Sequence, residues 1–303
     1  MQPKNYDAWP ALPYAEFSET AHVLHMLVQA IGKTKLITPF EPHWANVALW
    51  LTYRGFTTGP ISYQQGIFSI ELDLIEHKVI CQTSWSTVKY FDIKSGSVAE
   101  LTHNLFATLH ELGINKKINL MPQEIPNPIA FDQDTTVRQY NAALANAWMR
   151  IMTSTYIVLQ RYHARFRGIT PPVGLMWGTF DLRDARYLNV AVPTEGINSD
   201  YIRRNAMDVA QVEVGFWHGN PQYQKPAYFS FTYPQPKDIE KSIIQPKAAR
   251  WDKTLGEFIF DYDDVRTSTR PAEDLQAFFE STYAAGSTQA HWDPTLLGKG
   301  IPV

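Results

Sequence analysis

The chain has 303 residues, of which 45% are hydrophobic and 19% charged, and this composition excludes an intrinsically disordered protein. It carries 27 Lys and Arg against 30 Asp and Glu, a formal charge of -3 without a basic block. Because binding to nucleic acid requires concentrated positive charge, we expect no nucleic-acid partner. Aromatic residues make up 13% of the chain and include nine Trp, which predicts a large core and rings suited to lining a ligand pocket.

The sequence contains a single cysteine, Cys81, which excludes an internal disulfide and a zinc site built from thiolates. The first residues lack a positively charged segment followed by an apolar run, and no apolar stretch is long enough to span a bilayer. We therefore expect a cytoplasmic protein with no signal peptide and no membrane partner.

The first part of the chain predicts a helix, a group of strands and a second helix. Apolar residues spaced by three and four predict a helix over 14–33. Over 68–74, apolar residues alternate with polar ones, which is the period of a strand with one buried face. Ser97, followed three residues later by Glu100, forms a capping box that begins a helix over 97–112. Further strands are predicted over 47–54, 79–83 and 88–93.

A Pro-rich connector over 114–133 leads to a second part with the same order of elements. Apolar side chains at steps of three and four predict a long helix over 134–166, which Gly168 and two prolines end. Strands are predicted over 173–182, 211–217, 227–233 and 257–262. A last helix is predicted over 271–285, with residues 286–303 as a loose tail.

The strands follow one another through short turns and do not alternate with helices. The sequence therefore predicts an α+β fold of antiparallel sheets with helices packed on one face, and not a doubly wound parallel sheet. Residues 1–303 are expected to form a single compact unit. The order of helix, strands and helix over 14–113 and again over 134–285 suggests an internal duplication; the alternative is that any α+β protein with two sheets has this order.

Compact catalytic signatures are absent from the sequence. It has no phosphate-binding loop, dinucleotide fingerprint, nucleophile elbow or His-Glu-x-x-His run, so the sequence names no cofactor. A metal would have to recruit ligands from separate elements, and nothing in their spacing demands it, so no metal site is predicted. An enzyme with scattered site residues remains open.

A row of polar side chains follows the first predicted helix. His22, His25, Gln29 and Lys33 step by three, four and four, so they share one face of that helix. Such a row predicts donors and a titratable imidazole lining a cleft. The alternative is the solvent side of an amphipathic helix.

Four further segments place polar groups beside aromatic ones. His43 and Trp44 lie in a loop, and Arg54 to Thr58 combines two hydroxyls with glycine, a pattern that suits an anion or a carbonyl oxygen. On a strand, Trp177, Thr179 and Asp181 would share a face, as would Glu213, Gly215 and Trp217 opposite three core residues. The structural alternatives are a wedge that tethers the loop, a turn that needs glycine, and an Asp–Arg pair.

These segments resemble a bacterial family of uncharacterised proteins, domain-of-unknown-function family 5996. The matching stretches include Leu24-His25, Gln29 to Lys33, His43-Trp44, Arg54 to Thr58, Arg165-Phe166, Trp177 to Leu182, Gly215 to Trp217, Tyr233 to Pro236, Leu255 to Phe258 and Ser281 to Tyr283. The chain departs from the family at Gly174, where a His is expected. The resemblance covers nearly the whole chain; it implies kinship and a single unit, and it brings no established activity.

The sequence leaves two functions open. The first is a small-molecule-binding protein that could act as an enzyme, with His25, Asp181 and Glu213 as the acid–base groups and an aromatic-lined pocket. Its predicted ligand-binding residues are Gln29, Lys33, His43, Trp44, Arg54, Thr58, Trp177 and Trp217, with Lys33 or Arg54 as the anion anchor. The alternative is a non-catalytic protein that acts through association. Substrate, reaction and oligomeric state are not predicted.

Overall fold

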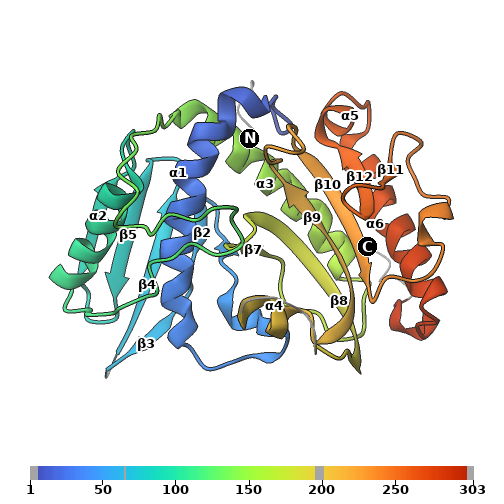
Figure 1. The fold of residues 1–303 in the computed structure, drawn as a ribbon, viewed down its shortest axis with the longest axis horizontal. Helices are drawn as coiled ribbons and strands as arrows, with labels where there is room; N and C mark the ends of the chain where they lie inside the picture. Colours follow the sequence, from blue (N-terminus) through green and yellow to red (C-terminus); the bar gives the residue numbers. More distant parts are fainter. Residues whose placement is uncertain (1–5, 65, 195–200, 299–303) are drawn as a thin grey trace. The chain divides into compact units, whose positions relative to one another are not determined.

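Two antiparallel sheets and the helices packed on them confirm the predicted α+β fold (Figure 1). The computed structural model describes residues 6–64, 66–194 and 201–298, without the side chains of residues 202 and 203. Proximity along the backbone divides the chain into two compact units. Unit 1 comprises residues 1–40, 46–153 and 174–181; unit 2 comprises residues 41–45, 154–173 and 182–303. The single compact unit and the internal duplication stay predictions.

Unit 1 is built on a sheet of order β1-β2-β4-β5-β6, with β3 also pairing with β4. Its strands are β1 (Trp50–Leu51), β2 (Gly55–Thr57), β3 (Ile61–Tyr63), β4 (Gly66–Asp73), β5 (Lys78–Thr83) and β6 (Val88–Asp92). The alternation predicted over 68–74 is confirmed, because Phe68, Ile70 and Leu72 are buried on one face of β4. The helices of this unit are α1 (Tyr14–Lys33), α2 (Val98–Glu111) and the first half of α3 (Ala142–His163). The predicted N-cap of α2 is confirmed, because the Ser97 hydroxyl accepts from the Glu100 N–H at 3.1 Å.

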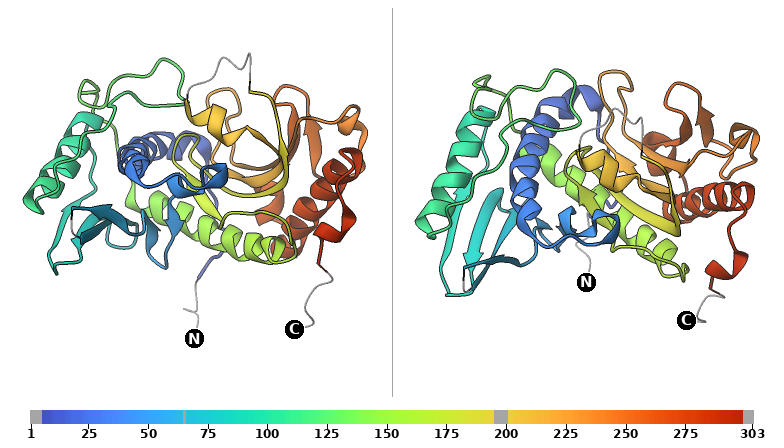
Figure 2. Two further views of the ribbon diagram at one scale, coloured as in Figure 1. Left: turned by 90° about the horizontal axis from the view of Figure 1, so that it is seen from below. Right: turned by 60° about the horizontal axis from the view of Figure 1, so that its bottom comes forward.

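Unit 2 carries the strand order β11-β12-β10-β9-β8. The strands are β8 (Asp181–Ala191), β9 (Val209–Trp217), β10 (Ala227–Tyr233), β11 (Arg250–Asp252) and β12 (Glu257–Asp261). The predicted last helix is α6 (Pro271–Gln289), the red helix of Figure 2, which contacts β9 and β10. Two short helices, α4 (Tyr201–Ala206) and α5 (Tyr262–Arg266), complete the unit.

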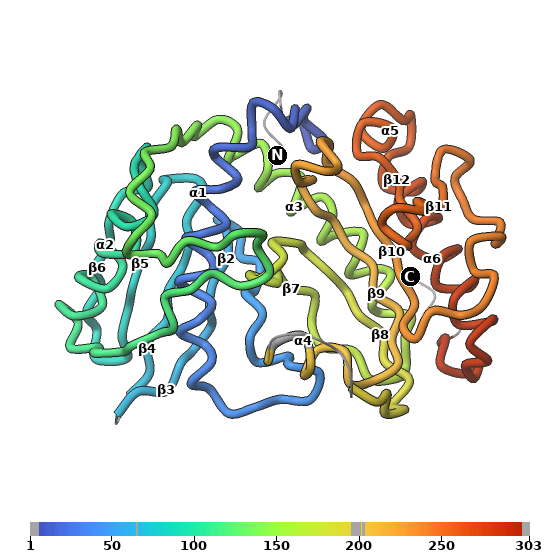
Figure 3. The backbone as a smooth tube through the Cα atoms, viewed as in Figure 1, coloured from blue at the N-terminus to red at the C-terminus, as the bar shows by residue number. Residues whose placement is uncertain are grey.

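Several predicted boundaries are wrong. Of the strand expected over 47–54, only the two residues of β1 form a strand, and a 3₁₀ segment (Pro42–Val47) precedes them. The long helix begins at Ala142, not at residue 134, and residues 112–141 form a long loop, drawn in green in Figure 3. The Asn141 carboxamide oxygen accepts from the N–H groups of Ala143 and Leu144 and so caps the helix where it begins. The last helix runs four residues beyond 285, and a 3₁₀ turn (Pro294–Leu296) follows it, so part of the expected tail is ordered.

The strand predicted over 173–182 is interrupted by a turn. Strand β7 (Gly174–Met176) ends there, and the Phe180 N–H donates to the Met176 carbonyl at 2.7 Å. Phe180 has a left-handed backbone, with φ of 65°. The prediction that Trp177, Thr179 and Asp181 share a strand face is therefore wrong, because the alternation of a strand does not persist through a turn.

Candidate functional site

The polar row of α1 lies against other segments of unit 1, and of its four members His22 keeps 34% of its side chain exposed. Gln29 is fully buried and its side-chain amide pairs with the backbone of Gln123. The Gln29 Nε2 donates to the Gln123 carbonyl at 2.8 Å, and the Gln29 Oε1 accepts from the Gln123 N–H at 2.8 Å. The Gln29 side chain thus makes two hydrogen bonds to the backbone of Gln123, as a neighbouring strand would, and holds the loop against α1.

Lys33 and Trp177 occupy the end of the same helix. The Lys33 ammonium donates to the Met121 carbonyl at 2.8 Å and lies 5.8 Å from the centre of the Phe131 ring. The Trp177 indole donates to the Val47 carbonyl at 3.0 Å and packs directly on Gly32. A Cβ on Gly32 would collide with that indole, which explains a glycine inside the last turn of α1.

His25 is held on both its edge and its face. Its Nε2 lies 2.9 Å from the Gly178 carbonyl, which can only accept, so this nitrogen carries the hydrogen. Its ring stacks on Phe180 with a centroid distance of 4.9 Å, and Phe180 stacks in turn on Trp148. Burial, opposed by the bond to Gly178, lowers the pKa of His25 to about 4, so the imidazole is neutral at pH 7.

The other predicted residues of unit 1 also contact the chain itself. Asp181 accepts a hydrogen bond from the Thr179 hydroxyl. The Arg54 Nε donates to Asp73 at 2.6 Å, and Thr58 accepts from the Ile70 N–H at 3.0 Å. These contacts fit residues that hold strands, a helix and two loops together.

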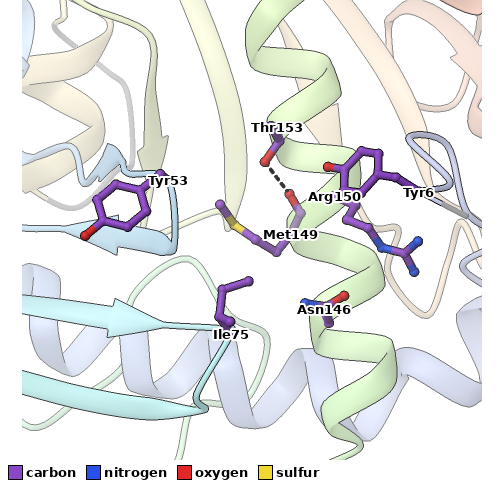
Figure 4. A pocket seen from close by; sticks show the side chains of 7 residues that line it. All are labelled: Tyr6, Tyr53, Ile75, Asn146, Met149, Arg150 and Thr153. Atoms are coloured by element: carbon purple, nitrogen blue, oxygen red, sulfur yellow. Dashed lines mark hydrogen bonds between the residues drawn. The ribbon is translucent and has the colours of Figure 1, made fainter. Parts of the chain in front are cut away.

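Unit 1 also has an open hollow of about 370 Å³ (Figure 4). Its lining residues are Tyr6, Tyr53, Ile75, Asn146, Met149, Arg150 and Thr153. Arg150 already donates to the Asp7 carbonyl at 3.0 Å, and Thr153 donates to the Met149 carbonyl at 2.9 Å. None of the predicted site residues lines this hollow, and none of its lining residues is a carboxylate or an imidazole.

In unit 2, His43 and Trp44 have an unusual backbone. Their φ and ψ angles are 59° and 26° for His43 and 55° and 30° for Trp44, both in the left-handed region. For non-glycine residues this region is unfavourable by about 1–2 kcal/mol each. The turn lays the His43 ring flat on Tyr187, with centroids 3.9 Å apart and an angle of 11° between the planes. Backbone strain that aims a ring in this way is found preferentially at functional sites.

The pairing of β8 with β9 places a set of polar side chains beside this stack. Tyr187 lies opposite Gln211, and Ala185 lies opposite Glu213. Opposed residues of an antiparallel pair point to the same face. The other face of β9 carries Val212, Val214 and Phe216, all buried, which confirms the predicted alternation of this strand. Gln211 and Glu213 therefore share a face with Tyr187.

Charged groups surround the stacked rings. The Arg183 Nε lies 3.4 Å from the Glu213 carboxylate, and both side chains are largely buried. Burial raises the pKa of Tyr187, whose hydroxyl is hydrogen-bonded to Arg183, so the phenol stays protonated. Burial is also the main cause that lowers the pKa of His43; nearby Asp208 acts in the opposite direction and Arg183 in the same one. His43 is therefore neutral at pH 7.

Three polar atoms of this set are buried and have no hydrogen-bond partner in the part of the chain that the structure describes. They are His43 Nδ1, Asp208 Oδ1 and Gln211 Oε1. The Gln211 Nε2 donates to the Ala206 carbonyl at 2.9 Å, which fixes the amide orientation and leaves its oxygen as the open acceptor. In native proteins a buried polar atom without a partner is explained by strain, by a catalytic role, or by a water or ion that it contacts.

We call His43, Arg183, Tyr187, Asp208, Gln211 and Glu213 the His43 site. Sequence reasoning identified His43 and Glu213 but missed Tyr187, Asp208 and Gln211. The register that places Tyr187 opposite Gln211 could not be determined from either strand alone.

Two predicted aromatic residues lie beside this set and not within it. Trp44 contacts the Tyr201 ring edge-on, with centroids 5.2 Å apart. Trp217 shares the face of Glu213 but lies about 13 Å further along the strand at ordinary strand rise. Its indole stacks on Tyr223, with centroids 5.6 Å apart.

The predicted acid–base set is divided, because His25 and Asp181 belong to unit 1 and Glu213 to unit 2. Within residues 6–64, 66–194 and 201–298, no group of three or more His, Cys, Asp or Glu side chains could hold a metal ion. Among the helices described, none is long and apolar enough to cross a membrane.

Comparison with known proteins identifies a family but no activity. No curated protein and no solved structure matches the chain. The model of a family of unknown function, DUF5996, matches residues 9–299, so the chain belongs to that family.

Proposed function

We propose that the protein binds a small molecule at the His43 site and that His43 is the acid–base group there. The observation that carries the proposal is the strained turn that holds the His43 ring on Tyr187 with a buried, unpartnered Nδ1. A neutral imidazole has one nitrogen that donates and one that accepts, which is the state that general acid–base chemistry uses near pH 7.

Glu213 has a supporting role in this proposal. Its carboxylate lies 3.4 Å from the Arg183 Nε, and Arg183 in turn bonds to the Tyr187 hydroxyl beneath His43. The earlier assignment of acid–base chemistry to His25 stays a prediction. The contacts of His25 with Gly178 and Phe180 favour a structural role for it.

The test is a thermal-shift screen of the full chain against amines, carboxylates, sugars and nucleosides. A ligand that binds only the folded state raises the melting temperature by mass action. His43→Phe keeps a ring on Tyr187 and removes both nitrogens, and His103→Phe changes an exposed histidine of α2 as a matched control. We expect a ligand whose shift persists in the control and disappears in His43→Phe. A shift that survives in His43→Phe, or no shift with any compound, would contradict the proposal.

One observation favours association as a second function. The outer face of the unit 1 sheet exposes apolar side chains, among them Ile67 at 44%, Val88 at 55% and Tyr90 at 60%. Apolar groups gathered on a sheet face suit contact with another copy of the chain. Sedimentation at rising concentration tests this. A dimer that Tyr90→Lys dissociates would support it, and a monomer at all concentrations would exclude self-association.

A further inference from the structure

The His43 site has an excess of hydrogen-bond acceptors. The amide oxygen Gln211 Oε1 and the carboxylate oxygen Asp208 Oδ1 are both hydrogen-bond acceptors. Both are buried without a partner in the described residues. His43 Nδ1 accepts when the hydrogen of the neutral ring is on Nε2. With that tautomer, no side chain of the site has a buried donor atom without a partner in the same part of the chain.

The fold brings these three acceptors to one end of the β8–β9 pair. Gln211 lies opposite Tyr187, and His43 is stacked on Tyr187. Asp208 immediately precedes β9, and its charge acts on both His43 and Tyr187. Gln211 is 1% exposed and His43 7%, so water competes poorly for their lone pairs.

The charge of the site also disfavours an anionic ligand. The charged side chains that act on His43 and Tyr187 are Arg183, Asp208 and Glu213. With His43 neutral, one cation and two carboxylates give a net charge of about -1. An anionic ligand would meet repulsion from Asp208, and the Arg183 guanidinium is already engaged by Glu213 at 3.4 Å.

We infer that the His43 site takes a ligand with a protonated primary amine. An ammonium group has three N–H donors and no acceptor, which matches the three open acceptor atoms in number and kind. Its positive charge complements the Asp208 carboxylate, whose charge acts on both His43 and Tyr187. An alcohol supplies only one donor, and a carboxylate supplies none. This inference rests on the proposed function and names the ligand class of the same site.

The experiment compares four probes of similar size on the full chain by isothermal titration calorimetry: phenethylamine, 2-phenylethanol, 3-phenylpropanoate and phenethyltrimethylammonium. We expect phenethylamine to bind most tightly. The trimethylammonium probe keeps the charge but has no N–H donor, so it should bind more weakly. Asp208→Asn should weaken phenethylamine binding at least about tenfold. Asp132→Asn, which changes an exposed aspartate of unit 1, should leave binding unchanged.

The outcomes separate the amine inference from the proposed function. If the carboxylate, the alcohol or the trimethylammonium probe binds as tightly or more tightly, and this binding is lost in His43→Phe, the amine inference is overturned and the proposed binding site stands. Failure of all four probes while another compound binds in a His43-dependent manner would do the same. The absence of any His43-dependent ligand would overturn both. If Asp208→Asn does not fold, the four-probe comparison on the unaltered chain decides the inference.

Discussion

Replacing His25 with Phe should change how the stability of the protein depends on pH. In the folded chain, burial lowers the pKa of His25 to about 4, whereas the unfolded value is about 6.5. The folded state therefore binds fewer protons than the unfolded state between these values, and stability falls as the pH falls from about 6.5 toward 4. Integration from pH 7.5 to pH 5 gives a loss of about 2 kcal/mol from this residue alone.

The Phe variant removes that titration and keeps the ring stacked on Phe180. At pH 7.5 it loses one hydrogen bond to the Gly178 carbonyl, a cost of about 1 kcal/mol. The wild-type chain should therefore be the more stable form at pH 7.5. At pH 5 the order should reverse, with the variant more stable by about 1 kcal/mol, because only the wild type takes up a proton at residue 25 when it unfolds and exposes the imidazole.

Urea unfolding followed by circular dichroism at pH 5, 6 and 7.5 measures this difference. Histidines such as His22 and His77, whose pKa values burial also lowers, are present in both chains and cancel. His103→Phe, at an exposed position of α2, serves as the control for a lost imidazole. Parallel stability curves for wild type and His25→Phe would refute the reasoning, since they would mean that His25 is not held neutral by burial.

Three further predictions concern packing, an ion pair and the thiol. Gly286→Ala should destabilise unit 2 by about 1–3 kcal/mol, because its Cβ would collide with the Thr232 hydroxyl, and a Thr232→Ala background should remove this cost in urea unfolding. Arg54→Met should lower the free energy of unfolding at pH 7, because it removes the ion-pair partner of Asp73. Although burial opposes it, backbone N–H groups and Arg54 hold the pKa of Asp73 below its ordinary value, so the cost of Arg54→Met should shrink as the pH falls through that folded pKa; a cost that stays the same throughout an acid titration would contradict this. Burial raises the pKa of Cys81 to about 12, so a thiol reagent at pH 8 should modify it only when the chain unfolds, and rapid modification of the native protein would contradict the burial.

Local patterns in the sequence predicted the elements that local physics determines. The alternation over 68–74 identified β4 because a strand with one buried face must repeat every two residues. The Ser97 and Glu100 pair identified the beginning of α2 because the first N–H groups of a helix need an acceptor. The apolar spacing over 14–33 identified the helix α1 to the residue at its end.

Features that depend on distant segments could not be predicted in the same way. Trp177 to Asp181 was interpreted as a continuous strand, yet the segment turns where Trp177 packs on Gly32 and bonds to the Val47 carbonyl. Both partners lie more than 100 residues away in the sequence. Neither His43 nor Trp44 is a glycine, so the sequence does not indicate a left-handed turn at these positions. The stack of His43 on Tyr187, a distant residue, explains the turn.

The polar row of α1 and the His43 site both contain histidine and glutamine, and they differ in which polar atoms already have a partner. Along α1, the side chains of Gln29 and Lys33 end on main-chain carbonyls, so a ligand there would have to displace bonds that already exist. At the His43 site, the strain of two left-handed residues and three buried lone pairs remain uncompensated within the described chain. Since folding alone gains nothing from either cost, a binding partner is the physical reason that we assign to them. Residue type and helical spacing cannot make this distinction, because it depends on which acceptors the fold has already used.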